Sequence, residues 1–350
     1  MMFTGKSRLT YKFIIPIVLL TFIFACSQVP ALAESYFRFC YPAIATILSF
    51  INRWVAFSLF DAGLIAAIIL CSGSIIMMIF KRLSFSGWLK KVLLSVLWIL
   101  VWFYLAWGIG YFRPDFFTRF ELEPPKEDRI FFEAFVNQYI DLLNQSYVSD
   151  PQFDVSEVDR DVEVLYKKYH EALRLPYPCG WRRTKKTLIE PLMTRVGVSG
   201  FFGPFFNEVH VNNYSLPISY PYTLAHEKAH QFGITGEAEC NLYATLICTS
   251  SDYPVVRYSG YLQTVSYLLG NLRKISPEQY REIAGRIDPR IIADYREIYE
   301  HWQKAYHETL SKVQEKAYDS YLKTNKQRSG ILSYSEMTGL LIAYREMMEK

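Results

Sequence analysis

The stretch that decides the fold is Tyr222-Thr-Leu-Ala-His-Glu-Lys-Ala-His-Gln231, followed by Glu237-Ala-Glu-Cys-Asn241. Residues four apart share one face of a helix, so His226 and His230 can direct their imidazoles at one metal ion. Glu227 lies beside that face, within reach of a water molecule at the ion. Catalytic zinc takes three protein ligands and leaves a fourth position for water. The spacing therefore predicts a Zn²⁺ site with His226 and His230 as metal ligands and Glu227 as the catalytic base.

The residues around the motif predict two helices joined by a short turn. Apolar residues before His226 and Ala229 between the two histidines suit a helix that is buried on one side. Gly233 follows as a typical C-terminal cap. The apolar run 242–248 then predicts a second helix that begins near Glu237. Such a pair of helices returns acidic residues to the two histidines, where a third ligand is needed.

The segment Glu237-Ala-Glu-Cys-Asn241 resembles the Glu-x-Glu-Ala-Asp/Asn segment of glutamate-zincin metallopeptidases. The resemblance implies that Glu237 is the third zinc ligand and that Asn241 forms a hydrogen bond with a ligand histidine. Asn241 replaces the commoner Asp, so it supports its histidine less strongly. The gap from His230 to Glu237 is shorter than in the large peptidases, so Glu239, otherwise placed behind the ligands, remains an alternative third ligand. Cys240 is interpreted as filling a small buried space.

The whole chain resembles an uncharacterised family of bacterial multi-pass membrane proteins with a zincin-like outer domain. Three apolar segments, the metal motif and the tail Tyr321-Leu-Lys through Gly330-Ile-Leu-Ser-Tyr334 carry this resemblance. It implies a fold class of α-helical membrane region plus an α+β domain, mainly helical and zincin-like, with a small β-sheet.

The charge of the chain divides it into two regions. Residues 1–119 contain 11 Lys or Arg and three Asp or Glu, whereas residues 120–350 contain 27 and 31. The formal net charge of +4 therefore combines regions of opposite sign and does not indicate nucleic-acid binding.

Three apolar runs, at about 13–29, 59–80 and 92–111, predict transmembrane helices. Basic residues at the N-terminus and in the loop between the last two runs favour the cytoplasmic side. The sequence thus predicts a multi-pass protein of the cell membrane, with the lipid bilayer as its partner and residues 120–350 outside the cytoplasm. The first run also fits a signal peptide cleaved after Ala33, but an uncleaved anchor is favoured, and both leave the C-terminal domain outside.

Residues 120–128 predict a stiff polar linker before a metal-binding domain at 129–350. The segment 208–212 alternates with period two and predicts a strand whose free edge can bind an extended peptide. Helices are predicted at about 130–145, 155–174, 255–272, 277–285, 290–323 and 335–348.

A zinc site of this type predicts hydrolysis of a peptide bond by activated water, with a peptide or protein as substrate. Tyr258, Tyr261 and His210 are candidates to contact the substrate or the developing oxyanion, on their order in the chain alone. A zincin-like binding or scaffold module without turnover is the alternative, and hydrolysis of a non-peptide bond in cell-wall material is a third hypothesis.

Overall fold

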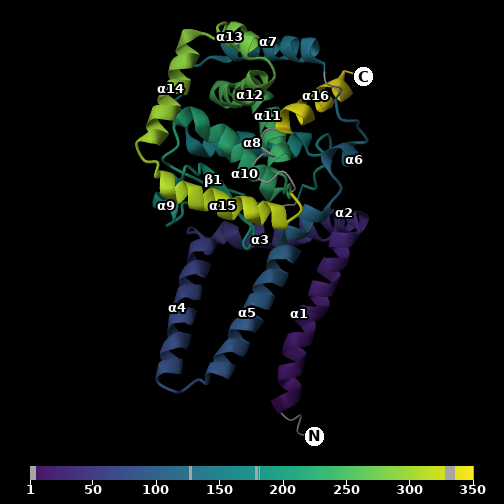
Figure 1. The fold of residues 1–350 in the computed structure, drawn as a ribbon, viewed down its shortest axis with the longest axis vertical. Helices are drawn as coiled ribbons and strands as arrows, with labels where there is room; N and C mark the ends of the chain where they lie inside the picture. The colour runs from purple at the N-terminus through teal and green to yellow at the C-terminus, as the bar shows by residue number, and fades with distance from the viewer. Residues whose placement is uncertain (1–4, 126–127, 178–179, 181, 328–335, 350) are drawn as a thin grey trace. The chain divides into compact units, whose positions relative to one another are not determined.

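The computed structural model describes residues 5–125, 128–177, 180, 182–327 and 336–349. They fall into two compact units. The first unit comprises Met1–Pro114, Pro178–Trp181 and Gly203–Glu208, and the second comprises Asp115–Tyr177, Arg182–Phe202 and Val209–Lys350. The described chain is mostly helical and contains one two-stranded sheet (Figure 1).

The first unit is built from helices. They are α1 (Gly5–Gln28), α2 (Pro30–Phe39), α3 (Tyr41–Trp54), α4 (Leu59–Ile79), α5 (Phe85–Ala106) and the 3₁₀ helix η1 (Gly108–Phe112). Within the described residues, α4 and α5 are each long and apolar enough to cross a membrane, with mean hydropathies of 2.4 and 1.8. The predicted spans at 59–80 and 92–111 therefore correspond to α4 and α5, although α5 begins and ends earlier in the chain than predicted.

The displacement has a local cause at Gly108. Helix α5 begins at Phe85, so that it includes Lys90 and Lys91, and it ends at Ala106. A Cβ atom at Gly108 would lie 2.7 Å from the ring of Phe103 and 2.8 Å from that of Tyr104. Only glycine permits this close approach, and the chain continues there as η1.

The first predicted span, 13–29, lies in α1 but does not continue straight. The helix ends at Gln28, and Pro30 starts α2, because proline disfavours helical geometry at the residue before it. Val29 accordingly has an extended backbone, with φ −122° and ψ 91°. The two helices meet the criteria for a membrane span only as a pair, with a bend of 115° between them.

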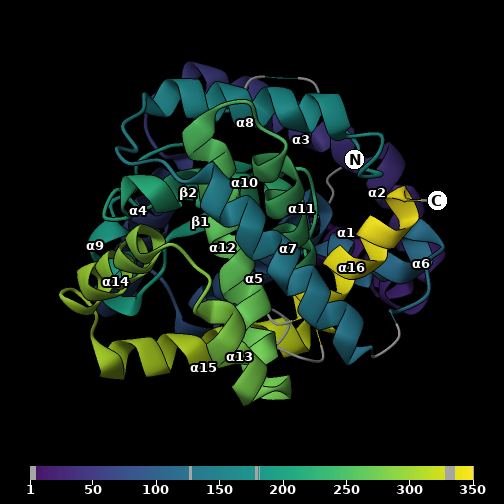
Figure 2. The same ribbon diagram turned by 90° about the horizontal axis from the view of Figure 1, so that it is seen from above.

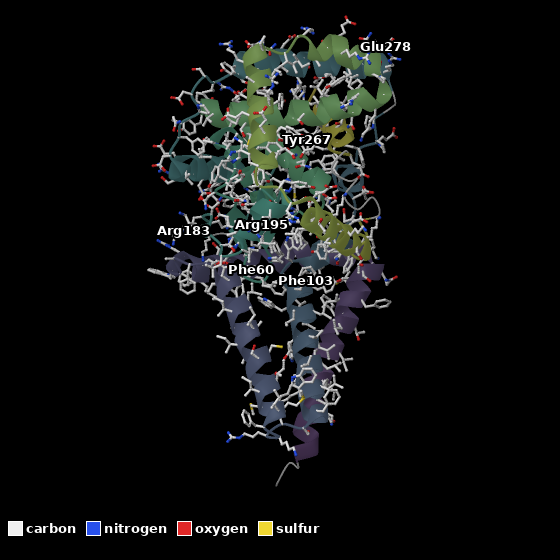
Figure 3. All side chains as sticks on the ribbon, turned by 60° about the vertical axis from the view of Figure 1, so that its left-hand side comes forward. Phe60, Phe103, Arg183, Arg195, Tyr267 and Glu278 are labelled. Carbon is white, nitrogen blue, oxygen red and sulfur yellow. The ribbon has the colours of Figure 1, made fainter. Side chains whose placement is uncertain are left out.

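The start of α4 has its backbone amides satisfied inside the first unit. The Ser58 hydroxyl accepts a hydrogen bond from the Asp61 amide at 3.1 Å. The buried carboxylate of Glu208 accepts from the amides of Leu59 and Phe60 at 3.0 and 2.9 Å. Phe60 is labelled in Figure 3. The first amides of a helix have no partner within the helix, so a carboxylate at this end stabilises both the amides and the helix dipole.

The second unit contains the small sheet and the remaining helices. Its elements are α6 (Phe116–Phe120), α7 (Arg129–Ser146), α8 (Val155–Tyr169), α9 (Glu190–Val196), β1 (Gly200–Gly203), β2 (Glu208–Val211), η2 (Pro217–Ser219), α10 (Tyr220–Gln231), α11 (Glu237–Thr249), α12 (Pro254–Ile275), α13 (Pro277–Ala284), α14 (Pro289–Gln303), α15 (Glu308–Thr324) and α16 (Met337–Met348). Each strand has one residue in the first unit, Gly203 or Glu208. The predicted strand at 208–212 corresponds to β2, which pairs with β1. The predicted helices at 130–145, 255–272 and 277–285 are confirmed by α7, α12 and α13.

The core of the second unit lies around α10 and α11. Figure 2 shows these helices near the centre of the unit, and α8 and α12 pack against both of them. Leu224, Ala225 and Ala229 of α10 are fully buried. Burial of apolar side chains is the main favourable term in folding, and His226, Glu227 and His230 therefore lie on a helix that the core of this unit fixes in place.

Two predicted helices differ from the structure, and two other predicted segments lie partly or wholly outside the described residues. The single helix predicted at 290–323 is two helices, because the chain turns at residues 304–307 and the His307 side chain caps the start of α15. The helix predicted at 155–174 ends at Tyr169. The tail segment 330–334 and residues 126–127 of the predicted linker lie outside the described residues.

Candidate metal centre

Helices α10 and α11 form the predicted pair, and a glycine closes the first of them. Gly233 has φ +96°, a conformation that residues with a Cβ rarely adopt. The amide of Ile234 then donates to the carbonyl of Ala229 at 3.0 Å, which closes the helix end. The chain reverses within a few residues and α11 begins at Glu237. This short turn returns α11 to the histidines of α10.

One carboxylate oxygen faces both histidines. Oε2 of Glu237 lies 3.1 Å from Nε2 of His226 and 3.6 Å from Nε2 of His230. All three residues are buried. The structure thus brings together the two histidines and the first of the two nearby acids.

The other nitrogen of each imidazole is held by an acceptor. Nδ1 of His226 lies 2.8 Å from Oδ1 of Asn241, and Nδ1 of His230 lies 2.8 Å from the carbonyl of Ile234. Because neither oxygen can donate, each Nδ1 donates the hydrogen bond and each Nε2 faces Glu237. Without a metal, a proton on Nε2 can donate to Oε2 of Glu237; a metal ion would displace such protons and bind the two Nε2 lone pairs and the carboxylate. This donor set and its hydrogen-bonded support fit a metal with two histidine ligands and one glutamate ligand.

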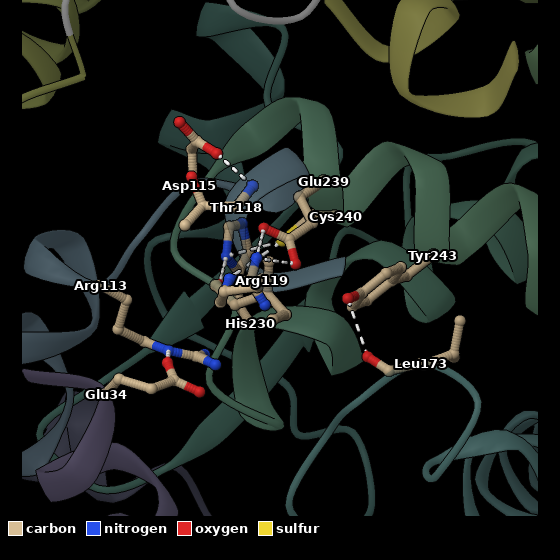
Figure 4. A network of polar contacts seen from close by, with 11 residues as sticks. Glu34, Arg113, Asp115, Thr118, Arg119, Leu173, His230, Glu239, Cys240 and Tyr243 are labelled. Atoms are coloured by element: carbon tan, nitrogen blue, oxygen red, sulfur yellow. Dashed lines mark hydrogen bonds and ion pairs between the residues drawn. The ribbon is translucent and has the colours of Figure 1, made fainter. Parts of the chain in front are cut away.

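Cys240 offers a different third ligand on the opposite side of His230. The ligand atoms of His226, His230 and Cys240 lie within 4.8 Å of one another, and Sγ of Cys240 is 3.2 Å from Nδ1 of His230 (Figure 4). That nitrogen already donates to Ile234. Burial raises the pKa of the Cys240 thiol to about 12, whereas a metal binds the thiolate. The geometry therefore favours Glu237 over Cys240.

Glu239 is occupied by an arginine that the sequence analysis missed. Its carboxylate forms an ion pair with Arg119 of α6, and both side chains are buried (Figure 4). A carboxylate held this way by a guanidinium is already neutralised. Glu239 therefore faces Arg119, while Glu237 faces the histidines. Nothing in the sequence near Arg119 indicated this pairing, because 120 residues separate the two.

Glu227 is the buried acid beside the histidines. Burial raises the pKa of its carboxyl group, against the opposing effect of His226 and His230. Within the described chain, no hydrogen bond holds this carboxylate. A Cβ atom at Gly200 would lie 2.9 Å from Cγ of Glu227 and 2.8 Å from Thr223, so only glycine lets β1 pass this close.

The strand next to Glu227 is an edge strand. On one side β1 pairs with β2, whose other side forms a parallel bridge between Val209 and Thr184. In the described part of the chain no further strand pairs with β1. The strand that contacts Glu227 is therefore β1, whereas the predicted strand at 208–212 pairs with β1 on one side and with Thr184 on the other.

Tyr318 contacts the centre from α15 and was also missed by the sequence analysis. Its hydroxyl donates a hydrogen bond to Oε1 of Glu237. Its ring stacks on that of Tyr321, with 5.9 Å between centroids. The signal was faint, since only the neighbouring tail from Tyr321 onward belonged to a recognised pattern.

The structure directs the three other candidate residues elsewhere. The hydroxyl of Tyr258 donates to Asp294. Tyr261 lines a separate cavity of about 480 Å³ near α16. His210 is buried in β2, where Nδ1 lies 3.0 Å from the Lys185 carbonyl and the ring stacks on Phe201.

The back of α10 is fixed by a buried charge network. Nζ of Lys228 lies 3.0 Å from Oδ1 of Asp159 and 2.9 Å from Oε2 of Glu163, both on α8. Arg182 also pairs with Glu163, at 2.7 Å. Burial opposes the charge on Lys228, but the two acids outweigh it and raise the pKa of Lys228 to about 12. These contacts set the rotation of α10, so that His226, Glu227 and His230 point to the other side.

Comparison with known proteins finds one family. The family model described as "Protein of unknown function (DUF3810)" matches residues 36–342. The match includes both candidate membrane spans and every residue of the candidate metal centre. No curated protein and no solved structure matches the chain.

Proposed function

The chain belongs to the DUF3810 family of proteins of unknown function, and from that premise we propose that it is a membrane-anchored zinc metallopeptidase of the glutamate-zincin type. One observation carries the proposal. The Nε2 atoms of His226 and His230 meet one oxygen of Glu237, and the carboxylate of Glu227 lies close enough to all three to interact with their charges. Zn²⁺ is the ion that this donor set suits best.

The ligands in this proposal are His226, His230 and Glu237, and the base is Glu227. Zinc held there would supply a Lewis acid and lower the pKa of a water molecule. Glu227 accepts a proton from the attacking water molecule, and the oxygen of that water bonds to the peptide carbonyl carbon. The carbon–nitrogen bond then breaks, and the proton passes from Glu227 to the leaving amine.

The position of β1 at the edge of the two-stranded sheet supports a peptide as the substrate. An extended chain added to this edge gains backbone hydrogen bonds that require no particular side chains. Gly200 brings the edge into contact with Glu227. A peptide bound along β1 would thus carry its backbone past the proposed base.

The proposed location is the outer face of the cell membrane. The loop between α4 and α5 and the residues that flank it carry Lys81, Arg82, Lys90 and Lys91, which favour the cytoplasmic side. With that loop inside, α5 leads outward and the chain after it lies outside. This argument needs only the two helices that individually meet the criteria for a span.

The test compares the full-length wild type with Glu227→Gln in detergent micelles supplied with zinc. We expect about one zinc ion per chain in both proteins, by mass spectrometry of the metal. We expect cleavage of a mixed peptide library by the wild type alone, with a loss of at least ~100-fold in the variant.

Cleavage by a metal-loaded Glu227→Gln protein would contradict the assigned base. A wild type that holds zinc but cleaves no peptide would favour the alternative, a zincin-like binding or scaffold module. A wild type without zinc would remove the basis of both.

A further inference from the structure

The second unit contains an open cleft of about 860 Å³ that is separate from the candidate metal centre. Its walls come from α9 and the residues before it, from the segment after β2, and from the turn between α14 and α15. The lining includes Glu190, Thr194, Arg195, Asn213, Tyr214 and Lys304.

A short chain of contacts connects this cleft to the proposed base. Gly200 packs against Glu227, and the preceding carbonyl, that of Ser199, accepts from the Asn212 amide at 2.7 Å. The Asn212 side chain donates to Thr194, which lines the cleft, at 3.1 Å. Two hydrogen bonds through Asn212 therefore connect Thr194 in the cleft wall to Ser199, the residue before the glycine that touches Glu227.

The cleft has an excess of positive charge. Arg195 and Lys304 are both exposed and, within the described residues, neither forms an ion pair. The one acid that lines the cleft, Glu190, accepts a hydrogen bond from the side-chain amide of Asn213 at 2.7 Å. Two cations facing one engaged carboxylate leave a site that attracts an anion.

The walls of the cleft are fixed before any ligand arrives. The His307 amide donates to the Arg195 carbonyl at 2.8 Å, which ties α9 to the turn that carries Lys304. The ring of Tyr214 stacks on His301 with 4.1 Å between centroids. A preformed site loses less conformational entropy on binding than a flexible one.

We propose that this cleft is the specificity subsite of the peptidase, and that Arg195 and Lys304 bind a carboxylate of the substrate close to the cleaved bond. The proposal rests on the proposed function for its place in the reaction. The carboxylate can belong to an Asp or Glu side chain or to the C-terminus of a short peptide. Both present the same planar anion, which a guanidinium binds through two hydrogen bonds.

The experiment measures cleavage and binding separately on the full-length protein loaded with zinc. Matched peptides differ only in Asp against Asn at each position, and in a free against an amidated C-terminus. The proteins are the wild type, Arg195→Gln, Lys304→Gln, the double variant and Arg183→Gln. Arg183 is an equally exposed arginine that does not line the cleft, and Figure 3 labels both arginines.

We expect the wild type to prefer one of the carboxylate peptides by roughly tenfold in kcat/KM, with partial loss in each single variant and complete loss in the double variant. Arg183→Gln should keep the preference. The pair of peptides that shows the effect identifies the source of the carboxylate. Peptide cleavage without a carboxylate preference, or with a preference that survives the double substitution, would overturn the subsite and leave the proposed function intact.

The binding measurement keeps the two proposals distinguishable. The same fluorescent peptides are titrated into zinc-loaded Glu227→Gln, with and without the double substitution. If the wild type cleaves nothing, a carboxylate preference in binding that disappears in the double variant supports the anion site without a peptidase. Equal binding of all the peptides would overturn the anion site as well.

Discussion

Nδ1 of His226 on α10 lies 2.8 Å from Oδ1 of Asn241 on α11. The contact orients the imidazole, since the nitrogen that donates to the amide oxygen cannot also bind a metal. It also connects the two helices across the short turn at Gly233. One hydrogen bond thus couples the packing of the helix pair to the direction of Nε2 in the candidate metal centre.

Asn241→Ala is expected to weaken zinc binding by roughly 10- to 100-fold, because it removes the acceptor that holds His226. Asn241→Asp keeps an acceptor and should bind zinc at least as tightly as the wild type. The measurement is competition with a fluorescent zinc chelator. Equal affinity in the alanine variant would show that the contact does not orient a ligand.

Substitutions of Glu237, Cys240 and Glu239 should show which of these three residues is the third zinc ligand. Glu237→Ala is expected to lose zinc, whereas Cys240→Ser should retain it, because Cys240 faces the wrong nitrogen of His230. Glu239→Gln should also keep the metal, since the wild-type carboxylate faces Arg119. Metal content of each purified protein decides the assignment, with the fold checked by circular dichroism. Zinc lost from either control, with the fold intact, would transfer the role of ligand to that residue.

Tyr318→Phe removes the hydroxyl that donates to Glu237 and keeps the ring that stacks on Tyr321. We expect a 10- to 100-fold lower zinc affinity with little change in thermal stability. The same chelator competition measures the first quantity, and a melting curve of the zinc-free protein measures the second. A lower melting temperature with unchanged affinity would make Tyr318 a packing residue.

Gly200→Ala tests the contact between β1 and the proposed base. The new methyl group would lie within 3 Å of both Glu227 and Thr223, so one of them must shift. A displacement of this kind beside the reacting groups is expected to lower kcat/KM by roughly 100-fold while zinc remains bound. Gly270→Ala is the control, because a Cβ there meets no atom within 4 Å. Unchanged activity in Gly200→Ala would separate β1 from the site.

Lys228→Met is expected to destabilise the second unit by about 1–3 kcal/mol, because it leaves the half-buried Asp159 without a cation and Glu163 with Arg182 alone. The exposed Lys167→Met should change stability by less than about 0.5 kcal/mol. Urea unfolding monitored by circular dichroism compares the two. Equal midpoints would mean that the network contributes little.

The difference in stability between the wild type and Lys228→Met should depend on pH, because the fold raises the pKa of Lys228. A lysine has a pKa of about 10.4 in an unfolded chain, and the fold raises that of Lys228 to about 12. The stabilisation from its charge is therefore complete below about pH 10 and is lost as the pH rises through 12. The difference between the wild type and Lys228→Met should narrow over that interval. A difference that stays constant would contradict the raised pKa.

Local patterns in the sequence sufficed for much of the helical structure. The apolar runs gave α4 and α5, the period of the hydrophobic residues gave α7, α12 and α13, and Gly233 gave the end of α10. These features depend on neighbours a few residues apart, which a sequence displays directly. The prediction of one long helix at 290–323 was wrong, because local patterns do not show distant contacts. The turn at 304–307 is stabilised by the hydrogen bond from the His307 amide to the carbonyl of Arg195, more than 100 residues away.

By itself, the sequence determined the pattern of His226, Glu227, His230 and Glu237, because helical spacing and a short glycine turn leave little freedom in where they lie. Only the tertiary structure decided what surrounds them. Arg119 takes Glu239, Tyr318 holds Glu237, and Lys228 fixes the far side of α10. Each of these contacts joins residues from different parts of the chain, whose meeting follows from how the whole unit packs. The ion pair of Arg119 with Glu239 and the hydrogen bond of Tyr318 with Glu237 determine which acid faces the histidines, and no local pattern in the sequence shows either contact.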